Sequence, residues 1–215
     1  AEHIGAYSNG YSLGEIIGRG GTSGIGVFSF DFGGFIVDGG HSLKSKSSFL
    51  PSSASQAKPP QLLAHYDFPD DWEILLVILD SNNTVNGQKE VNIFQDYCPV
   101  PKNEVEQTSH IIFMNMIPFL LERDLPAFGH SIDEIQKRGF KNVEVSLQSQ
   151  QIRDLMDKLR EIGAYGVGMS SFGPTVYSVF DKNNKHIVEE IKEYVGNRGI
   201  VLTTKAQNYG HEIQK

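Results

Sequence analysis

Apolar and polar positions alternate most clearly in the second half of the chain. Over residues 149–162 the apolar side chains fall on one helical face and the charged side chains on the other, and Gly163 follows. This spacing predicts an amphipathic helix that ends at the glycine. Residues 72–80 are instead almost continuously apolar between polar turn sequences, which predicts a buried strand.

Shorter signals predict the other elements of this half. The sequence 98–101 should end a short helix, Pro118 should kink or end a second one, and Gly139 should end a third. The order of strand, helices, strand, helix and strand predicts an α+β fold with a mostly antiparallel sheet and helices on one of its faces. The predicted helices are 91–97, 103–123, 125–138 and 186–195, and the predicted strands are 175–180 and 200–203.

The first sixty residues lack this periodicity. Ser12 is expected to cap a short helix that carries Leu13, Ile16 and Ile17. Residues 42–60 are rich in serine, lysine and proline, which predicts a long exposed loop or a linker.

Glycine dominates residues 18–41, where it fills nine of 24 positions. Such a density is expected where the backbone adopts positive φ or approaches a neighbour closely. The segment begins as a loop and continues into an apolar, strand-like run at 35–37. Its first part offers backbone N–H groups, two hydroxyls and one guanidinium, which are groups that bind phosphate. The phosphate-binding candidates are Arg19, Gly20, Gly21, Thr22, Ser23 and Gly24, and the alternative is a tight connection whose glycines serve packing.

A second block of glycine and serine lies at 166–174, more than a hundred residues later. Like the first block, it stands between regular elements and is too polar for a core. We therefore expect the two blocks to line one cleft, where Ser170, Ser171 and Gly173 would join the binding candidates.

Charge and cysteine content narrow the classes of function. A net charge of −7 argues against a general binder of nucleic acids or acidic membranes, because those surfaces attract Lys and Arg. With Cys98 as its one cysteine, the chain cannot form an internal disulfide or a site of several thiolates. The longest apolar run, 74–79, is far shorter than the roughly 20 residues that cross a bilayer. No signal-like start is visible, so we expect a soluble, cytoplasmic protein.

Five segments, in order, resemble the β-ribofuranosylaminobenzene 5′-phosphate synthases, an archaeal family of the GHMP kinase superfamily. They are GRGGTSGIG, FGGFIVDGGH, YDFPDDW, YCPVP and GVGMSSFGPTVYSV, and the resemblance covers nearly the whole chain. It departs at Met169 and Phe172, where the family has Gln and Trp. The resemblance implies a GHMP-kinase-like two-layer fold, in which residues 1–62 belong to the N-terminal domain and residues 63–215 form the C-terminal domain.

The resemblance also implies a reaction. An aromatic acid, 4-hydroxybenzoate or 4-aminobenzoate, would attack C1 of phosphoribosyl pyrophosphate and release pyrophosphate and carbon dioxide, on the way to tetrahydromethanopterin. A substrate with several phosphate charges requires N–H donors, a cation such as Mg²⁺ and a guanidinium, here Arg19. Asp38 and His41 are the catalytic candidates. The alternatives are that Asp38 only holds a turn with Gly39 and Gly40, and that His41 is an ordinary surface residue.

Two other functions stay open at this point, and a homodimer is one possible assembly. The first is an ATP-dependent kinase of the same superfamily. Such kinases carry a catalytic Asp at the position that resembles Gly26, and its loss weakens general-base catalysis. The second is a non-catalytic fragment, because two features of the family are expected to be absent. They are a long segment before this point and a phosphate loop that would begin at Gly5, where this chain continues directly to Ala6.

Overall fold

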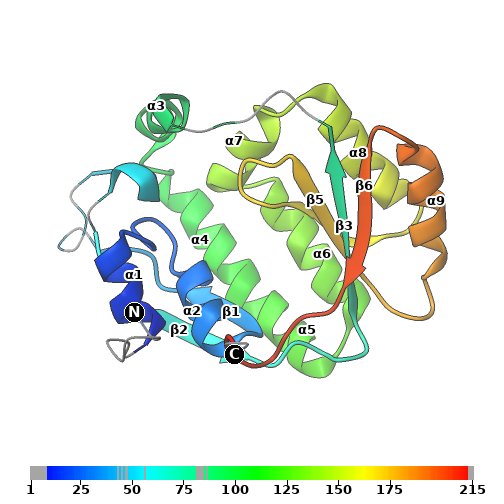
Figure 1. Cartoon of the computed structure of the whole chain (residues 1–215), viewed down its shortest axis with the longest axis horizontal. Coiled ribbons are helices and arrows are strands. Elements are labelled where there is room, and N and C mark those ends of the chain that lie inside the picture. The colour runs from blue at the N-terminus through cyan, green and yellow to red at the C-terminus, as the bar shows by residue number, and fades with distance from the viewer. Residues whose placement is uncertain are drawn as a thin grey trace. The chain divides into compact units, whose positions relative to one another are not determined.

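The computed structural model describes residues 9–42, 44, 46, 48–55, 57–80, 85 and 87–212 (Figure 1). They form two compact units. The first contains the described residues up to Phe68, residues 87–98 and residues 206–212, and the second contains the others. The expected boundary after residue 62 differs from this one. A division there would cut strand β2 (Leu62–Tyr66), which pairs with β1 (Phe35–Asp38) inside the first unit.

Helix α1 (Gly10–Ile17) opens the first unit. Asn9 caps it, not Ser12 as expected, because the Asn9 side chain accepts the N–H of Ser12 at 2.8 Å. The helix ends at Gly18, which adopts the left-handed conformation with φ 71° and donates its N–H to Gly14. Only a residue without a Cβ adopts this conformation at little cost, so the glycine fixes the end of the helix.

Helix α2 (Ile25–Phe32) was not expected inside the glycine-rich segment. It packs against α1 through glycines, since a Cβ on Gly14 would lie 3.0 Å from Cγ2 of Val27. One turn earlier, the N–H of Gly10 donates to both carboxylate oxygens of Asp31, at 2.7 and 2.8 Å. Two glycines four residues apart therefore let the two short helices approach closely. The predicted strand at 35–37 is confirmed as β1, which pairs with β2 in an antiparallel two-stranded sheet.

The residues described between 42 and 60 form a long connection, as expected, but they are not a free linker. Among the residues described there, only the 3₁₀ turn η2 (Ser52–Ala54) is regular. Pro51, Pro59 and Pro60 are nevertheless buried. The described part of the segment is therefore packed into the first unit. Helix α3 (Gly87–Tyr97) belongs to the same unit; it is the short helix predicted at 91–97, and it begins earlier than predicted.

The second unit is organised around a four-stranded sheet with the order β4-β5-β3-β6, in which all neighbours are antiparallel. The predicted strands are confirmed as β3 (Glu73–Leu79), β5 (Thr175–Phe180) and β6 (Gly199–Thr204), with β3 between the other two. Strand β4 (Tyr165–Met169) was not expected, because its glycines were assigned to the second block. The helices of this unit are α4 (Lys102–Ile111), the π-helical turn η3 (Ile112–Met116), α5 (Ile117–Glu122), α6 (Leu125–Gln136), α7 (Gly139–Ser146), α8 (Gln150–Glu161) and α9 (His186–Val195).

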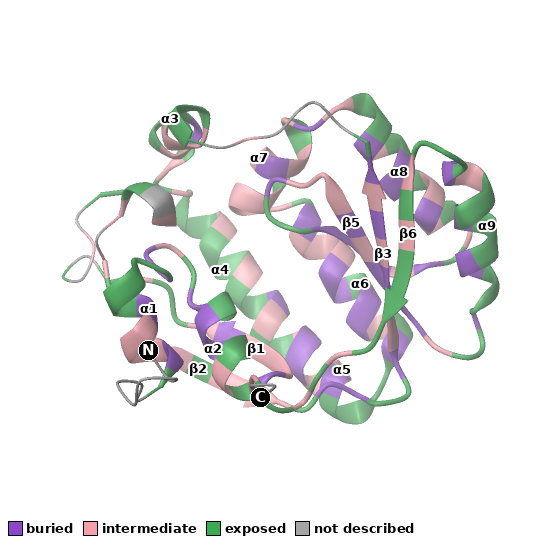
Figure 2. Cartoon of the chain, viewed as in Figure 1, coloured by how far each residue is buried: buried purple, intermediate pink, exposed green. Residues whose placement is uncertain are grey.

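The main core lies between this sheet and helices α8 and α9, where Figure 2 shows buried positions on all three. Alternate residues of β3 point into it, because side chains alternate across a strand. The predicted apolar faces of both helices are confirmed as buried. The side chains that meet there include Leu75, Val77, Ile152, Leu155, Leu159, Ile187 and Ile191. Helix α6 packs along β4, where Gly129 meets the backbone of Gly166.

The helix predicted at 103–123 is confirmed, because α4, η3 and α5 follow one another without a gap from Lys102 to Glu122. Of the two effects expected of Pro118, a kink or an end, the end does not occur. The π-helical turn directly before Pro118 changes the hydrogen-bond pattern where the proline lacks an N–H, as such turns do. Gly139 begins α7 and does not end α6; its N–H donates to the Glu104 carboxylate at 3.1 Å. Within the described residues, no helix combines the length and the apolar character required to cross a membrane.

Candidate functional site

The first glycine block connects α1 to α2, and three of its glycines are needed for packing. A Cβ on Gly20, where φ is 83°, would lie 2.8 Å from Cγ of Pro59. A Cβ on Gly21 would lie 3.0 Å from Cβ of Ser55, and one on Gly24 would lie 2.7 Å from the ring of Phe28. These contacts support the packing alternative for the three glycines, since real Cβ atoms rarely approach so closely.

Thr22 and Lys46 fasten the block to the following connection. The hydroxyl of Thr22 donates to the carbonyl of Leu50 at 2.8 Å and accepts from Nζ of Lys46 at 3.1 Å. The same Nζ donates to the carbonyls of Gly21 at 2.6 Å and Leu50 at 2.7 Å. Burial lowers the pKa of Lys46, and the nearby Cys98 partly opposes that shift. The three donors of Lys46 are thus used inside the protein, a role that no sequence signal indicated.

Asp38 joins the block to the end of β1. One carboxylate oxygen accepts the Ser23 hydroxyl at 2.9 Å and the N–H of Gly24 at 2.8 Å, and the other accepts the N–H of Gly40 at 2.9 Å. The negative charge therefore lies at the N-terminus of α2, where it is stabilised. These contacts support the alternative in which Asp38 holds a turn, and they show that it also holds the start of α2. The catalytic role of Asp38 stays a prediction.

His41 lies close to Asp38 in the sequence but has a different environment. Its Nε2 donates to the carbonyl of Lys58 at 2.8 Å. Lys58 in turn pairs with Glu15 at 2.7 Å, so Glu15 does not pair with Arg19. His41 lines an open pocket of about 770 Å³ together with Tyr11 and other residues. A proton-transfer role for His41 stays a prediction.

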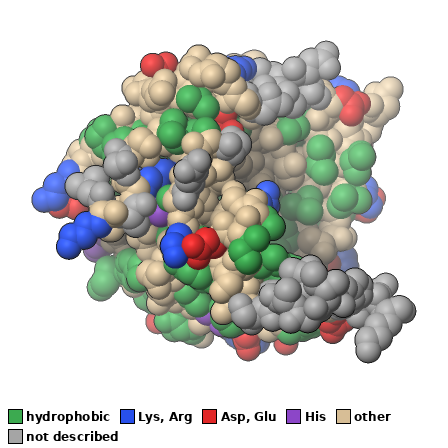
Figure 3. Space-filling model, turned by 60° about the vertical axis from the view of Figure 1, so that its left-hand side comes forward, with side chains coloured by type: hydrophobic (Ala, Val, Ile, Leu, Met, Phe, Trp, Pro, Cys, Tyr) green, Lys and Arg blue, Asp and Glu red, His purple; other side chains and the backbone are tan. Residues whose placement is uncertain are grey.

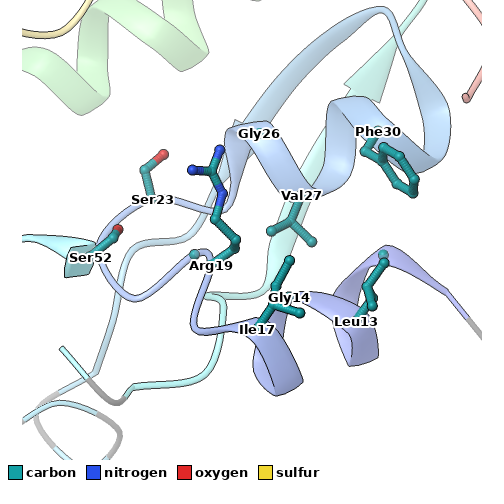
Figure 4. Close-up of a pocket in the computed structure, with 11 residues that line it drawn as sticks. Leu13, Gly14, Ile17, Arg19, Ser23, Gly26, Val27, Phe30 and Ser52 are labelled. Carbon is teal, nitrogen blue, oxygen red and sulfur yellow. The ribbon is translucent and has the colours of Figure 1, made fainter. Parts of the chain in front are cut away.

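Basic and acidic side chains lie near one another on the face shown in Figure 3, between groups of hydrophobic side chains. Arg19 differs from this pattern, because its guanidinium has no hydrogen bond or ion pair to any residue that the structure describes. It lines a pocket of about 380 Å³ between α1 and α2 and points toward the first turn of α2, beside Gly26 (Figure 4). The other lining residues are Gly10, Leu13, Gly14, Ile17, Gly20, Ser23, Val27, Phe30 and Ser52.

The second block forms a tight turn between β4 and β5. The N–H of Ser170 donates to Thr175 at 3.0 Å, and the N–H of Gly173 donates to Ser170 at 2.8 Å. The N–H groups of Ser171 and Phe172 have no partner among the described residues, and the same holds for the two serine hydroxyls. Both serines are exposed, and Ser171 has φ 47°. Two N–H groups and two hydroxyls can therefore meet an anion.

The half-buried Lys141 and the buried Gln148 fix the carbonyls of this turn. Nζ of Lys141 donates to the carbonyls of Met169 and Ser171, each at 3.2 Å, and the Gln148 side chain donates to the carbonyl of Phe172. Because C=O and N–H point in opposite directions across a trans peptide, the N–H of Phe172 is directed away from Lys141. Sequence reasoning missed both anchoring side chains, since neither stands in a motif.

Met169 and Phe172, where the chain departs from the family pattern, are core residues. Only 1% of Met169 and 5% of Phe172 is exposed. The ring of Phe172 meets that of Phe140 edge-on, with centroids 5.9 Å apart. Both side chains therefore serve packing in this chain.

Three further expectations concern Gly5, the common cleft of the glycine blocks and a metal site. Gly5, where the family's phosphate loop would begin and where this chain was expected to lack it, lies outside the described residues. The two glycine blocks belong to different units, so their common cleft stays a prediction. Among the described residues, no group of three or more His, Cys, Asp or Glu side chains gathers as metal ligands.

Comparison with known proteins agrees with the predicted resemblance. Residues 116–200 match the family model described as GHMP kinases C terminal. The chain is 50% identical over 210 residues to the β-ribofuranosylphenol 5′-phosphate synthase of Methanothermobacter thermautotrophicus. This alignment covers 98% of the present chain and 64% of the relative. It is 47% identical over 212 residues to the enzyme of the same name from Methanocaldococcus jannaschii, with 95% and 62% covered. The chain thus spans just under two thirds of these relatives.

A solved structure supports the fold. The homoserine kinase of Cytophaga hutchinsonii superimposes with a TM-score of 0.59 at 16% identity, over 86% of this chain and 52% of the kinase. At this identity the likeness concerns the fold alone. Together these findings confirm the predicted resemblance and the α+β fold of the GHMP type.

Proposed function

Over the part of the fold that it spans, this chain is related to the β-ribofuranosylphenol 5′-phosphate synthases, and from this relationship we propose that it forms part of a decarboxylating ribosyltransferase. The observation that carries the proposal is the identity of 47–50% over nearly the whole chain. The donor would be phosphoribosyl pyrophosphate. The relatives' name specifies a ribosylated phenol, which favours 4-hydroxybenzoate over 4-aminobenzoate as the acceptor, in the synthesis of tetrahydromethanopterin.

The proposed reaction exchanges one bond at each reacting carbon. The ring carbon that bears the carboxylate attacks C1 of the ribose, the C1–O bond breaks, and pyrophosphate leaves with the electron pair. The bond between the ring and the carboxylate then breaks, its electron pair returns to the ring, and carbon dioxide departs. No redox partner is required, because the electrons of the broken bonds stay with pyrophosphate and the ring.

The second glycine block offers the donors for the phosphate charge. The N–H groups of Ser171 and Phe172 and the hydroxyls of Ser170 and Ser171 are exposed or without a partner among the described residues. Fixed N–H groups of this kind stabilise developing negative charge without reorganising. Mg²⁺ would arrive with the pyrophosphate, since magnesium is commonly held by substrate phosphates and few carboxylates. The described residues supply no three-ligand set for it, and we assign no step to it.

The experiment uses the protein that contains this chain and measures three products of the proposed reaction. 4-Hydroxybenzoate labelled in its carboxyl carbon is incubated with phosphoribosyl pyrophosphate and Mg²⁺, and labelled carbon dioxide and pyrophosphate are counted. We expect equal amounts of both and a ribosylated phenol by mass spectrometry. A parallel incubation with ATP and small alcohols should release no ADP, because Gly26 has no carboxylate. Pyrophosphate without carbon dioxide, alcohol-dependent ADP, or no product in either incubation would contradict the proposal.

A further inference from the structure

Two of the donors that the first block was expected to offer a phosphate are used inside the protein. The composition of the block predicted a phosphate contact for Arg19, supported by Ser23 and Gly24. In the structure the Ser23 hydroxyl and the Gly24 N–H already donate to Asp38, at 2.9 and 2.8 Å. A phosphate at this end of α2 would also meet the negative charge of Asp38, which repels a phosphate more strongly than a singly charged carboxylate. Arg19 is the remaining charged group of the block.

The pocket beside Arg19 has an apolar wall. Leu13 and Ile17 come from α1, and Val27 and Phe30 come from α2 (Figure 4). The ring of Phe30 is held in place, because it stacks on His211 with centroids 3.8 Å apart and planes inclined by 6°. The volume of about 380 Å³ is at the small end of ligand pockets. A single cation above an apolar wall matches a small ligand with one anionic group.

We propose that this pocket binds an aromatic monocarboxylate, with its carboxylate on Arg19 and its ring on the wall formed by Leu13, Val27 and Phe30. A guanidinium binds a carboxylate through two parallel hydrogen bonds, and apolar side chains stabilise a ring by burying it. The inference rests on the proposed function, whose acceptor is such an acid. It divides the two substrates between the blocks: the acid binds beside the first, and the phosphates bind at the second.

Gly26 allows a sharp test of this assignment. A Cβ added to Gly26 would meet no atom within 4 Å, so Gly26→Asp and Gly26→Asn both fit. The two variants have nearly the same size, but only Asp adds a negative charge at the pocket, where it repels a carboxylate and attracts Arg19. By isothermal titration, 4-hydroxybenzoate should bind about tenfold more weakly to Gly26→Asp than to Gly26→Asn. Inorganic pyrophosphate should bind the two variants equally.

Substitution of Arg19 gives the second part of the binding test. Arg19→Gln should weaken 4-hydroxybenzoate about tenfold, and Arg19→Lys should restore part of the loss, because Lys lacks the planar fork. Arg123→Gln is the matched control, since Arg123 is an exposed arginine of the second unit that pairs with Asp71. It should leave both ligands unaffected.

The outcomes separate this inference from the proposed function. Arg19→Gln that weakens pyrophosphate and spares 4-hydroxybenzoate would overturn the assignment and return Arg19 to the phosphates. Equal binding of the acid to all variants, or no measurable binding of it to the unmodified protein, would also overturn it, even if carbon dioxide is released. A reaction that releases no carbon dioxide while these variants behave as expected would reject only the proposed reaction.

Discussion

The two glycine blocks have similar compositions but use their peptide groups differently. In the first, Gly20, Gly21 and Gly24 make room for neighbours, and the donors of Ser23 and Gly24 satisfy Asp38. In the second, Lys141 and Gln148 bind the carbonyls, and two N–H groups and two hydroxyls stay without a partner among the described residues. The N–H groups of residues 20–23 also have no partner among the described residues, so the two blocks differ mainly in the charge beside them. Asp38 accepts from the first block and Lys141 donates to the second, and this charge, rather than the number of glycines, bears on whether a block can bind an anion.

The largest effect is expected for Gly20→Ala, which tests the packing role of the first block. Its positive φ and its approach to Pro59 should together lower the free energy of unfolding by about 2 to 4 kcal/mol. Gly26→Ala is the matched control in the same segment. It lies in a helix with open space around it, and should raise stability by about 0.5 to 1 kcal/mol. Urea unfolding followed by circular dichroism measures both, and a Gly20→Ala protein as stable as the unmodified one would break the comparison.

The variant Lys141→Met tests whether the hydrogen bonds to the carbonyls of the second block matter for anion binding. Without the ammonium, the carbonyls of Met169 and Ser171 lose their donor, and the turn no longer holds its N–H groups outward. The affinity for inorganic pyrophosphate should fall about tenfold, equivalent to about 1.4 kcal/mol. Lys137→Met, which removes a lysine paired with Glu134 at 2.8 Å, is the control and should bind normally. Unchanged affinity in Lys141→Met would show that the carbonyl anchors do not matter for binding.

The variant Asp38→Asn distinguishes a structural role of Asp38 from a catalytic role. If Asp38 mainly holds the start of α2, loss of its charge should reduce stability by about 1 kcal/mol, because a charged acceptor of three hydrogen bonds becomes neutral. Melting temperature and turnover are measured on the same preparation. A large loss of turnover at unchanged melting temperature would instead support the catalytic role predicted from the sequence.

The smallest expected effect is a pH dependence confined to the second unit. Hydrogen bonds from Lys137 and Arg138 lower the pKa of Glu134 from 4.5 to about 2. A carboxyl group with a lower pKa in the folded state stabilises the fold above pH 4.5, and the contribution is lost as the pH falls toward 2. Because the group lies near the surface, we expect less than about 1 kcal/mol. Glu134→Gln should melt lower than the unmodified protein at pH 7 and equally near pH 2; a constant difference would contradict this.

The sequence predicted most of the second unit because its elements have strong patterns. The helix at 186–195 and the strand at 175–180 have the predicted bounds, and the helix at 149–162 differs by one residue at each end. The misses have local causes. Helix α2 stands between glycines that resemble a loop. Strand β4 contains two glycines: Ile132 leaves no room for a side chain at Gly166, and Tyr177 leaves none at Gly168.

The candidate site was predicted less completely. Composition indicated which groups can bind phosphate, and Arg19 and the two serines of the second block do offer donors without a partner among the described residues. It could not show that Lys46, Lys141 and Gln148 would occupy the carbonyls, or that Asp38 would occupy Ser23 and Gly24. Such contacts join residues far apart in the sequence, and no local pattern carries them.

The most direct test of this difference is a nuclear magnetic resonance titration of the ¹⁵N-labelled protein with inorganic pyrophosphate. Amide signals report the contacts of individual N–H groups with the added anion. We predict that the amides of Ser171 and Phe172 shift on binding. The amides of Ser23 and Gly24 should not shift, because the Ser23 hydroxyl and the Gly24 N–H hold the Asp38 carboxylate, which repels the anion. Shifts at Ser23 and Gly24 with Ser171 and Phe172 unchanged would contradict the assignment of the phosphates to the second block.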